Sequence, residues 1–394
     1  MKTKDMSAIA FMAAMLASNP SIVRAQDANA DNVLLVKIAH VTPLSNRYMR
    51  DIAQESINAA ALAVADLNAR GLMANGKKLR FQSIDMDDAA SAATAVEVAQ
   101  RICKGSFAGV VGHLNSGTTI KAAPYYEQCA IPHITVAATN PVITASGHKT
   151  SYRLVGHDAD LGQLLGFVAT SDSKTRRIAV LHDRTFYGEL IATNFMKGVT
   201  RSGGQILWSD SIAEYAPGPT TVVQRLKDTG VELLFYGGMD GVAGKFLKEM
   251  AYQKVDNVAL MGGDGICSDQ LPTLAGSAEA ASAVLCGEGG APVERMPKGA
   301  AFAARYHSEF QKLVKTYAAQ TYDAFMALAA AMELANSIDP SGYQEFLGKV
   351  TFDGISGQIA FDAKGDLSNP VFTVFKYQEG KKVVKQLYHL SDIR

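Results

Sequence analysis

The sequence predicts an α/β fold with two lobes, each built on a parallel sheet with helices on both faces. The chain has 394 residues, more than the roughly 250–300 residues at which a single core stops growing. Apolar, β-branched segments alternate with segments of helical periodicity, and this alternation occurs twice along the chain. Alternation of this kind is typical of parallel sheets covered by helices.

The first series begins at residues 33–41 (VLLVKIAHV), which are apolar and β-branched, as in a buried strand. Residues 51–70 carry Ile57, Ala61 and Val64 at helical spacing, and Gly71 ends the predicted helix. The series then alternates between strands and helices: strand 78–84, helix 89–103, strand 109–112, helix 116–128 and strand 131–136.

A second series starts at residues 177–182 (RIAVLH). It is predicted to continue with helix 188–202, strand 205–211, helix 220–229, strand 233–237, helix 241–253 and strand 258–262. Three helical stretches (299–314, 319–336 and 342–349) and three strands (359–361, 371–377 and 382–388) complete the chain. The last two strands are expected to form a hairpin around Glu379-Gly380.

Composition and charge exclude some classes of protein. The chain is 48% hydrophobic and 19% charged, which excludes wholesale disorder. It has 38 basic and 38 acidic residues, whereas a dedicated nucleic-acid binder carries a basic excess to neutralise phosphates. We therefore expect no nucleic-acid partner.

The N-terminus predicts export. Lys2 and Lys4 precede an apolar run over residues 7–17, and Val23-Arg24-Ala25 resembles a cleavage site. We expect a signal peptide over residues 1–25; the alternative is a buried N-terminal helix. The apolar run is shorter than the roughly 20 residues that span a bilayer.

The four cysteines fit an oxidising compartment. Cys103, Cys129, Cys267 and Cys286 contain no C-x-x-C pair, so a zinc ribbon or thioredoxin site is not expected. Of the three possible connectivities we favour the local one, Cys103–Cys129 and Cys267–Cys286. The alternative is four buried thiols.

Three clusters of small or polar residues follow predicted strands, where ligands of such sheets bind. In the first, Ser116 begins a helix after residues 112–115 (GHLN). Hydroxyl and free N–H groups at a helix N-terminus bind anions; the alternative is that Ser116 only caps the helix.

The second and third clusters offer small residues and an acid. Residues 137–141 (AATNP) would let a ligand approach the backbone, or form an ordinary turn. Asp264, within residues 261–265 (MGGDG), is expected to be an exposed carboxylate that holds a cation or ammonium group. An Asx-turn is the alternative for Asp264.

The motif search gives little support to catalysis. The sequence contains no G-x-x-x-x-G-K-[ST], no G-x-S-x-G and no H-E-x-x-H. Asp85-Met86-Asp87-Asp88 lacks EF-hand spacing and is interpreted as a solvated strand end rather than a metal cluster. We expect no catalytic residue, metal or cofactor.

Taken together, these segments resemble the leucine/isoleucine/valine-binding proteins, the solute-binding subunits of branched-chain amino-acid ABC importers. The matching stretches run in order over almost all of the chain: 59–68 (AAALAVADLN), 112–119 (GHLNSGTT), 137–141 (AATNP), 182–188 (HDRTFYG), 236–238 (YGG) and 364–367 (KGDL). The resemblance implies a type I periplasmic-binding fold, in which three crossovers join two Rossmann-like lobes and the lobes close on a ligand.

The resemblance also implies a ligand site. Ser116 falls where the family's hydroxyl meets the ligand carboxylate, and Ala137 and Thr139 fall where backbone and hydroxyl groups meet the carboxylate and ammonium. Tyr187 falls on an aromatic of the second lobe that covers the ligand. Asp264 stands where leucine-type members have a glutamate that pairs with the ammonium. The side-chain pocket would be lined by Leu114, Asn115, Ala138 and Tyr317.

Four departures from the family pattern leave the ligand's side chain open. Asp264 is one methylene shorter than the usual glutamate, and Asn115 places an amide beside an otherwise apolar pocket. Ile52 stands near the position of an aromatic in many relatives, and Met239 replaces a tyrosine.

The implied function is capture of an amino acid, leucine/isoleucine/valine-like, in the periplasm and its delivery to an ABC permease by a monomer. The implied lobes are residues 26–157 with 289–369, and residues 158–288 with 370–394. One alternative is a sensor or binder of amides, urea or aromatic acids on the same fold; another is an enzyme on two α/β lobes.

Overall fold

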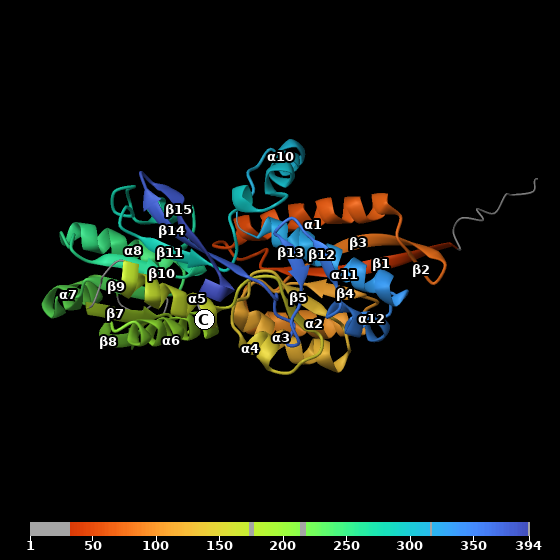
Figure 1. The fold of residues 1–394 in the computed structure, drawn as a ribbon, viewed down its shortest axis with the longest axis horizontal. Coiled ribbons are helices and arrows are strands. Elements are labelled where there is room, and N and C mark those ends of the chain that lie inside the picture. The colour runs from red at the N-terminus through yellow and green to blue at the C-terminus, as the bar shows by residue number, and fades with distance from the viewer. Residues whose placement is uncertain (1–31, 173–176, 213–217, 316, 393–394) are drawn as a thin grey trace, which may run out of the picture.

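The computed structural model describes residues 32–172, 177–212, 218–315 and 317–392. The expected signal peptide lies outside these residues. Two α/β lobes lie side by side along the long axis of the molecule (Figure 1). We call the part built on the six-stranded sheet lobe 1 and the part built on the seven-stranded sheet lobe 2.

The sheet of lobe 1 has the strand order β2-β3-β1-β4-β5-β6. All neighbouring strands are parallel except β2 and β3, which are antiparallel. The bounds are β1 (Val33–Thr42), β2 (Met73–Ala74), β3 (Lys77–Asp87), β4 (Gly109–Val111), β5 (His133–Thr135) and β6 (Ser151–Arg153).

The sheet of lobe 2 has the strand order β15-β14-β11-β10-β9-β7-β8. Its first five strands in chain order are parallel, and β14 runs antiparallel to both β11 and β15. The bounds are β7 (Arg177–His182), β8 (Gln205–Ser211), β9 (Leu233–Gly237), β10 (Ala259–Gly262), β11 (Leu285–Glu288), β14 (Val371–Gln378) and β15 (Lys381–His389).

Helices cover both sheets. In lobe 1 these are α1 (Arg50–Arg70), α2 (Ala92–Lys104), α3 (Ser116–Gln128), α4 (Val142–Ala145), α10 (Gly299–Phe310), α11 (Ala318–Ala335) and α12 (Pro340–Leu347). In lobe 2 they are α5 (Asp158–Phe167), α6 (Phe186–Arg201), α7 (Thr220–Thr229), α8 (Asp240–Tyr252) and α9 (Leu271–Leu274). None of the helices in the described ranges has the length and apolar character needed to cross a membrane.

The expected α/β fold with two lobes is confirmed, but the sheets are mixed rather than wholly parallel. The predicted hairpin forms, and its turn residues Glu379 and Gly380 have φ values of 50° and 74°. A two-residue turn of this kind reverses the chain and makes β14 and β15 antiparallel. The strand expected over 359–361 belongs to a separate two-stranded sheet of β12 (Thr351–Asp353) and β13 (Gln358–Ala360).

Some elements were not predicted or end elsewhere. Strands β6 and β11 and helix α5 were not among the predicted elements. Helix α10 ends at Phe310 instead of residue 314 because Gln311 has a left-handed φ of 53°. Helix α2 begins at Ala92, because Ser91 caps it and accepts a hydrogen bond from the Thr94 N–H.

The acidic segment 85–88 is a solvated strand end only in part. Asp85 is exposed and pairs with the buried His40 at 2.8 Å. Asp88, in contrast, is fully buried, and its Oδ2 lies 2.7 Å from His113 Nδ1. A buried charge needs such a partner, so the pair of Asp88 and His113 belongs to the interior of lobe 1. Within the described ranges no group of three or more His, Cys, Asp or Glu side chains could hold a metal ion.

Both expected disulfides are confirmed. Cys103–Cys129 joins the end of α2 to the residue after α3, and Cys267–Cys286 joins the turn after β10 to β11. Each bond therefore lies within one lobe, and each closes a short loop, for which the chain-entropy model gives about 3 kcal/mol of stabilisation.

The chain passes between the lobes three times: after β6, after β11 and before β14. The first two passages touch, because the Gly156 N–H donates to the Gly289 carbonyl at 3.1 Å. A Cβ on Gly289 would lie 2.4 Å from the Gly156 oxygen. Glycine at position 289 therefore permits this close approach.

Candidate functional site

The two lobes meet where the carboxyl ends of their parallel strands lie, and we call this region the junction. Several hydrogen bonds cross it, among them two between residues far apart in the chain. The Tyr317 hydroxyl, at the start of α11 in lobe 1, donates to Asp264 Oδ2 in lobe 2 at 2.8 Å. Asn140 Nδ2, after β5 in lobe 1, donates to the Phe186 carbonyl at the start of α6 at 2.7 Å. The structure is therefore one in which the lobes are in contact.

Ser116 is the first residue of α3 and is not its cap. Asn115 holds the N-cap position and makes no capping hydrogen bond through its side chain. By contrast, Thr185 caps α6 by accepting a hydrogen bond from the Gly188 N–H at 2.9 Å. The Ser116 Oγ instead accepts from the Asn140 N–H at 3.3 Å. The first turn of α3 keeps N–H groups that no side-chain cap satisfies, which suits an anion.

The loop after β5 is tied to the loop after β4. The Thr135 hydroxyl donates to the His113 carbonyl at 2.7 Å and accepts from the Ala138 N–H at 3.0 Å. Ala137 and Ala138 are buried, as is Leu114 in the preceding loop. Of the residues proposed on the lobe 1 side, Leu114, Asn115, Ser116, Ala137, Ala138 and Thr139 all lie on these two adjoining loops or at the start of α3.

Arg153 holds the loop after β5 through side-chain hydrogen bonds. Its side chain is fully buried, and its Nη1 donates to the Asn140 carbonyl at 2.7 Å. Its Nη2 donates to Thr144 Oγ1 at 2.9 Å, and its Nε donates to Asp366 Oδ1 at 2.9 Å. A guanidinium paired in this way fixes several acceptors at once, so the loop carrying Thr139 is held in place before any ligand arrives.

Asp158 is a site residue that the sequence analysis missed. It is fully buried at the start of α5, and its Oδ2 accepts from the Thr139 hydroxyl at 2.8 Å. That bond directs the Thr139 proton to a carboxylate of this chain and leaves the Thr139 oxygen able to accept a hydrogen bond. The Asp158 Oδ1 is buried with no hydrogen-bond partner in the part of the chain described. Burial raises the pKa of Asp158 well above its usual value, and the nearby Asp264 raises it further.

The sequence did hold one signal for Asp158. His157-Asp158-Ala159-Asp160 has the acidic first turn of a helix start, and the His157 side chain accepts from the Asp160 N–H. An acid at such a position is usually exposed. Only the three-dimensional arrangement, which places the first passage between the lobes beside Thr139, shows that this one is buried.

Asp264 follows β10 and begins a short 3-10 turn. Contrary to expectation it is not an exposed carboxylate: it is half-buried, and its Oδ1 is buried without a partner among the described residues. Its Oδ2 is bonded to Tyr317, so the Asx-turn alternative is not what the structure has. Burial raises the pKa of Asp264, although hydrogen bonds from Tyr317 and Tyr187 act to lower it.

Tyr187 lies on the lobe 2 side, in the first turn of α6. Its hydroxyl accepts from the Gly265 N–H at 2.9 Å, which places the ring beside the turn that carries Asp264. Burial raises the pKa of both Tyr187 and Tyr317, so both hydroxyls stay protonated and able to donate.

The junction therefore gathers two kinds of unsatisfied group. Lobe 1 offers the uncapped first turn of α3 and the Ser116 hydroxyl, which suit an anion. Asp158 and Asp264 each present a buried carboxylate oxygen, which suits a cation. Two hydrogen bonds, from the Asn140 N–H to Ser116 Oγ and from the Thr139 hydroxyl to Asp158, connect the two regions through neighbouring residues.

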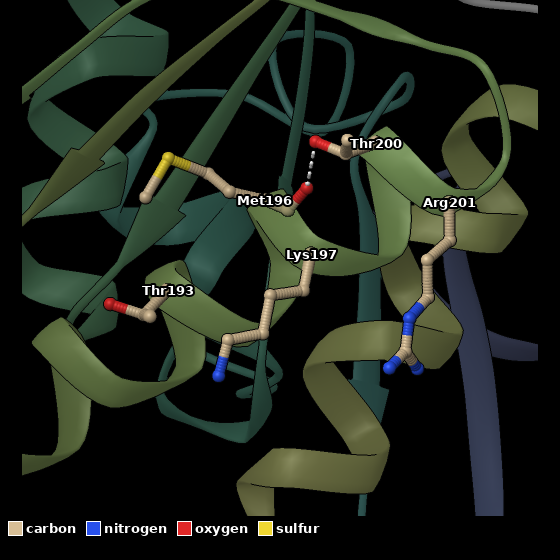
Figure 2. A pocket seen from close by; sticks show the side chains of 5 residues that line it. All are labelled: Thr193, Met196, Lys197, Thr200 and Arg201. Atoms are coloured by element: carbon tan, nitrogen blue, oxygen red, sulfur yellow. Dashed lines mark hydrogen bonds between the residues drawn. The ribbon is translucent and has the colours of Figure 1, made fainter.

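A groove on the surface of lobe 2 is separate from this site. Figure 2 shows its lining, which comes entirely from α6: Thr193, Met196, Lys197, Thr200 and Arg201. The Thr200 hydroxyl donates to the Met196 carbonyl of its own helix at 2.9 Å. The groove contains none of the predicted site residues, and we assign it no function.

A two-lobed α/β protein with a polar site between the lobes has the architecture of a binding receptor. The family model for periplasmic binding proteins matches residues 35–381, so this chain belongs to the periplasmic binding protein family.

Curated relatives agree with this placement. The Leu/Ile/Val/Thr-binding protein of Salmonella typhimurium is 29% identical, over 87% of this chain and 91% of that protein. The leucine-, isoleucine-, valine-, threonine- and alanine-binding protein of Pseudomonas aeruginosa is 30% identical, over 81% of this chain and 84% of that protein.

Solved structures share the fold. The branched-chain amino acid transporter substrate binding protein LivJ from Streptococcus pneumoniae, in complex with isoleucine, has a TM-score of 0.79 at 22% identity, covering 90% of this chain and 99% of that one. A solute binding protein from R. palustris in complex with benzoate has a TM-score of 0.77 at 17% identity, covering 90% and 96%.

Proposed function

We propose that this protein is an exported solute-binding protein that captures an α-amino acid between its lobes and delivers it to the permease of an ABC importer. One observation carries the proposal: an uncapped helix start lies at the same junction as two buried carboxylate oxygens that have no partner among the described residues. A zwitterion is the small solute that satisfies both at once.

The ligand carboxylate is assigned to the first turn of α3 and the Ser116 hydroxyl. Ser116 Oγ already accepts from the Asn140 N–H, so its own proton is free to donate. The backbone of Ala137 and the oxygen of Thr139 lie on the adjoining loop, within the same region. Charge-assisted hydrogen bonds of this kind are roughly twice as strong as neutral ones.

The ligand ammonium is assigned to Asp158 and Asp264. Each has one oxygen held by a hydroxyl of this chain and one without a partner. An ammonium between them also removes the repulsion of two buried carboxylates. A buried carboxylate left unpaired is costly, so the ligand and these acids stabilise each other only when the lobes are closed.

The names of the relatives favour a small set of amino acids, namely leucine, isoleucine, valine and threonine. Leu114, Ala138, Asn115 and Tyr317 would lie around the ligand's side chain. A binder of amides, urea or aromatic acids on the same fold is the second candidate, because one structural neighbour holds benzoate. Such ligands bring no ammonium: urea and amides donate N–H groups to Asp158 and Asp264 without neutralising them, and an aromatic acid adds a further negative charge. The two buried carboxylates therefore favour the amino acid over these ligands.

The proposed lobes are residues 26–157 with 289–369, and 158–288 with 370–394. We propose cleavage of residues 1–25 on export, with the mature protein acting in the periplasm.

A thermal-shift panel tests the function. The mature protein is heated with each of the twenty amino acids, with acetamide, urea and benzoate, and without additive. Selective stabilisation by one or more α-amino acids is expected. Stabilisation by the amides or benzoate alone would contradict the proposal, as would turnover of any of these compounds.

A further inference from the structure

The side chain of Asn115 carries a buried acceptor that the protein does not use. Asn115 Nδ2 donates to the Met49 Sδ at 3.3 Å. Its Oδ1 is buried and has no hydrogen-bond partner in the described chain. The side-chain oxygen of an N-cap asparagine normally accepts a hydrogen bond from a backbone N–H in the first turn of its helix. The Asn115 side chain makes no such bond.

The contact with Met49 fixes which way the amide faces. A thioether sulfur accepts hydrogen bonds weakly and cannot donate. The NH₂ group must therefore face Met49, because the opposite orientation would set two acceptors against each other. The amide oxygen is thus turned away from Met49, at the residue next to Ser116.

A second amide repeats the pattern one turn beyond Tyr317. Gln320 is only 3% exposed, and its Oε1 is buried without a partner among the residues described. Its Nε2 lies against Gly290, on the second passage between the lobes. Residues three apart on a helix share a face, so Gln320 is on the side of α11 from which Tyr317 reaches Asp264.

A buried acceptor without a donor in the protein affects which ligands the site prefers. A site built to hydrogen-bond a substrate N–H or O–H rejects the analogue that lacks it, whereas an apolar pocket barely distinguishes the two. The α-ammonium is already required by Asp158 and Asp264, so it does not serve the amide of Asn115 as well. A further donor has to come from the ligand's side chain.

We infer that the preferred ligand is an α-amino acid whose side chain carries a hydrogen-bond donor, and that Asn115 is the residue that determines this specificity. The inference rests on the proposed function. It separates this chain from a receptor for purely aliphatic side chains, which has no use for a buried amide oxygen at this position.

Calorimetric titration of the mature protein with near-isosteric pairs tests the inference. The pairs are threonine with valine, serine with alanine, asparagine with leucine, and glutamine with methionine. In at least one pair the donor-bearing member should bind about 5- to 150-fold more tightly, which corresponds to one unmatched buried acceptor. The inference is overturned if the aliphatic member of every pair binds as tightly as its polar counterpart.

A variant then assigns the preference to a residue. Asn115→Leu should abolish or reverse it, while Asn257→Leu, at an exposed position of lobe 2, should leave it unchanged. A preference that survives Asn115→Leu would overturn the role of Asn115, and the wild-type titration decides the ligand class even if that variant does not fold. If no amino acid binds at all, the proposed function itself fails, whereas equal or tighter binding of the aliphatic member in every pair leaves that function standing and removes only this inference.

Discussion

The two sides of the junction are built differently. On the lobe 1 side, the loops that carry Ser116 and Thr139 are bonded to each other and supported by the buried Arg153. On the lobe 2 side, Tyr187 stands in the first turn of α6 and Asp264 on a short turn, and Asp264 accepts the Tyr317 hydroxyl from across the junction. The lobe 1 loops are thus held mainly by bonds within their own lobe, apart from the bond between Thr139 and Asp158, while Asp264 depends on a side chain of the other lobe.

This difference separates residues that hold the site together from residues that hold the ligand. A buried network that is fully satisfied within one lobe contributes to folding. A carboxylate is different when it is buried with one oxygen unpaired. Its burial lowers the free energy of unfolding, and the unpaired oxygen contributes favourably only when a ligand binds to it. Substitutions on the lobe 1 side should therefore change mainly the free energy of unfolding, and substitutions of Asp264 should change mainly the affinity for the ligand.

The largest effect is expected from Arg153→Met, on the lobe 1 side. The change leaves Asp366 without its guanidinium and the Asn140 carbonyl without its donor, which should cost about 3–5 kcal/mol of unfolding free energy. Denaturant unfolding followed by fluorescence measures it. Arg225→Met, at an exposed pair with Asp210, is the control and should cost about 1 kcal/mol or less. Equal losses in the two variants would contradict the supporting role of Arg153.

Asp264→Asn should act on affinity and not on stability. Loss of one carboxylate from the ammonium should weaken binding of the amino acid about 100-fold, or about 2.7 kcal/mol, in calorimetry. The unfolding midpoint should stay the same or rise, because burial disfavours this carboxylate in the empty protein. The exposed Asp256→Asn in the same lobe is the control. Unchanged affinity in Asp264→Asn would show that our assignment of the ammonium site is wrong.

Lobe 1 should also be the acid-sensitive side. Burial lowers the pKa of His133 to about 3 from a usual value near 6.5. Between these pH values His133 is protonated in the unfolded chain and neutral in the folded chain. The free energy of unfolding therefore falls as the pH falls from 6.5 toward 3. From pH 6.5 to 5 the loss is about 2 kcal/mol. The difference in unfolding free energy between wild type and His133→Gln should shrink by that amount; a constant difference would contradict the assignment.

The smallest effect is expected from Asn140→Ser, which tests the contact between the lobes. The serine hydroxyl can still accept from the Val142 N–H, as Asn140 Oδ1 does at 3.0 Å, but it is too short to reach the Phe186 carbonyl, and it buries no charge. Loss of this single bond should weaken ligand affinity about 3- to 10-fold. X-ray scattering should show a less closed protein at subsaturating ligand, and an unchanged profile would argue against a closing role for Asn140.

Much of this site followed from local pattern. Ser116, Ala137, Thr139 and Asp264 stand at strand ends, and the ordered motifs placed them on one surface before any coordinates. Both disulfides were predicted, because each joins cysteines close in sequence.

What local pattern missed depends on contacts between distant segments. Asp158 and Arg153 look like ordinary surface residues in the sequence, and their burial follows from the packing of the first passage between the lobes and of the loop around Asp366. The bond from the Thr139 hydroxyl to Asp158 could not be predicted either, because it joins two segments whose packing the sequence does not show. The burial of Asp264 was missed because the glycines around it indicate a tight turn, while Tyr317 that covers it lies 53 residues further along the chain.

The placement of the two cross-links has one more consequence. Because all four cysteines are used within a lobe, oxidation stiffens each body on its own and adds no covalent restraint to the swing between them. Reduction of the two disulfides should make each lobe less rigid without changing the freedom of movement between the lobes. The disulfides can therefore stabilise each lobe in an oxidising compartment without restricting the movement between the lobes on which the proposed capture and release depend.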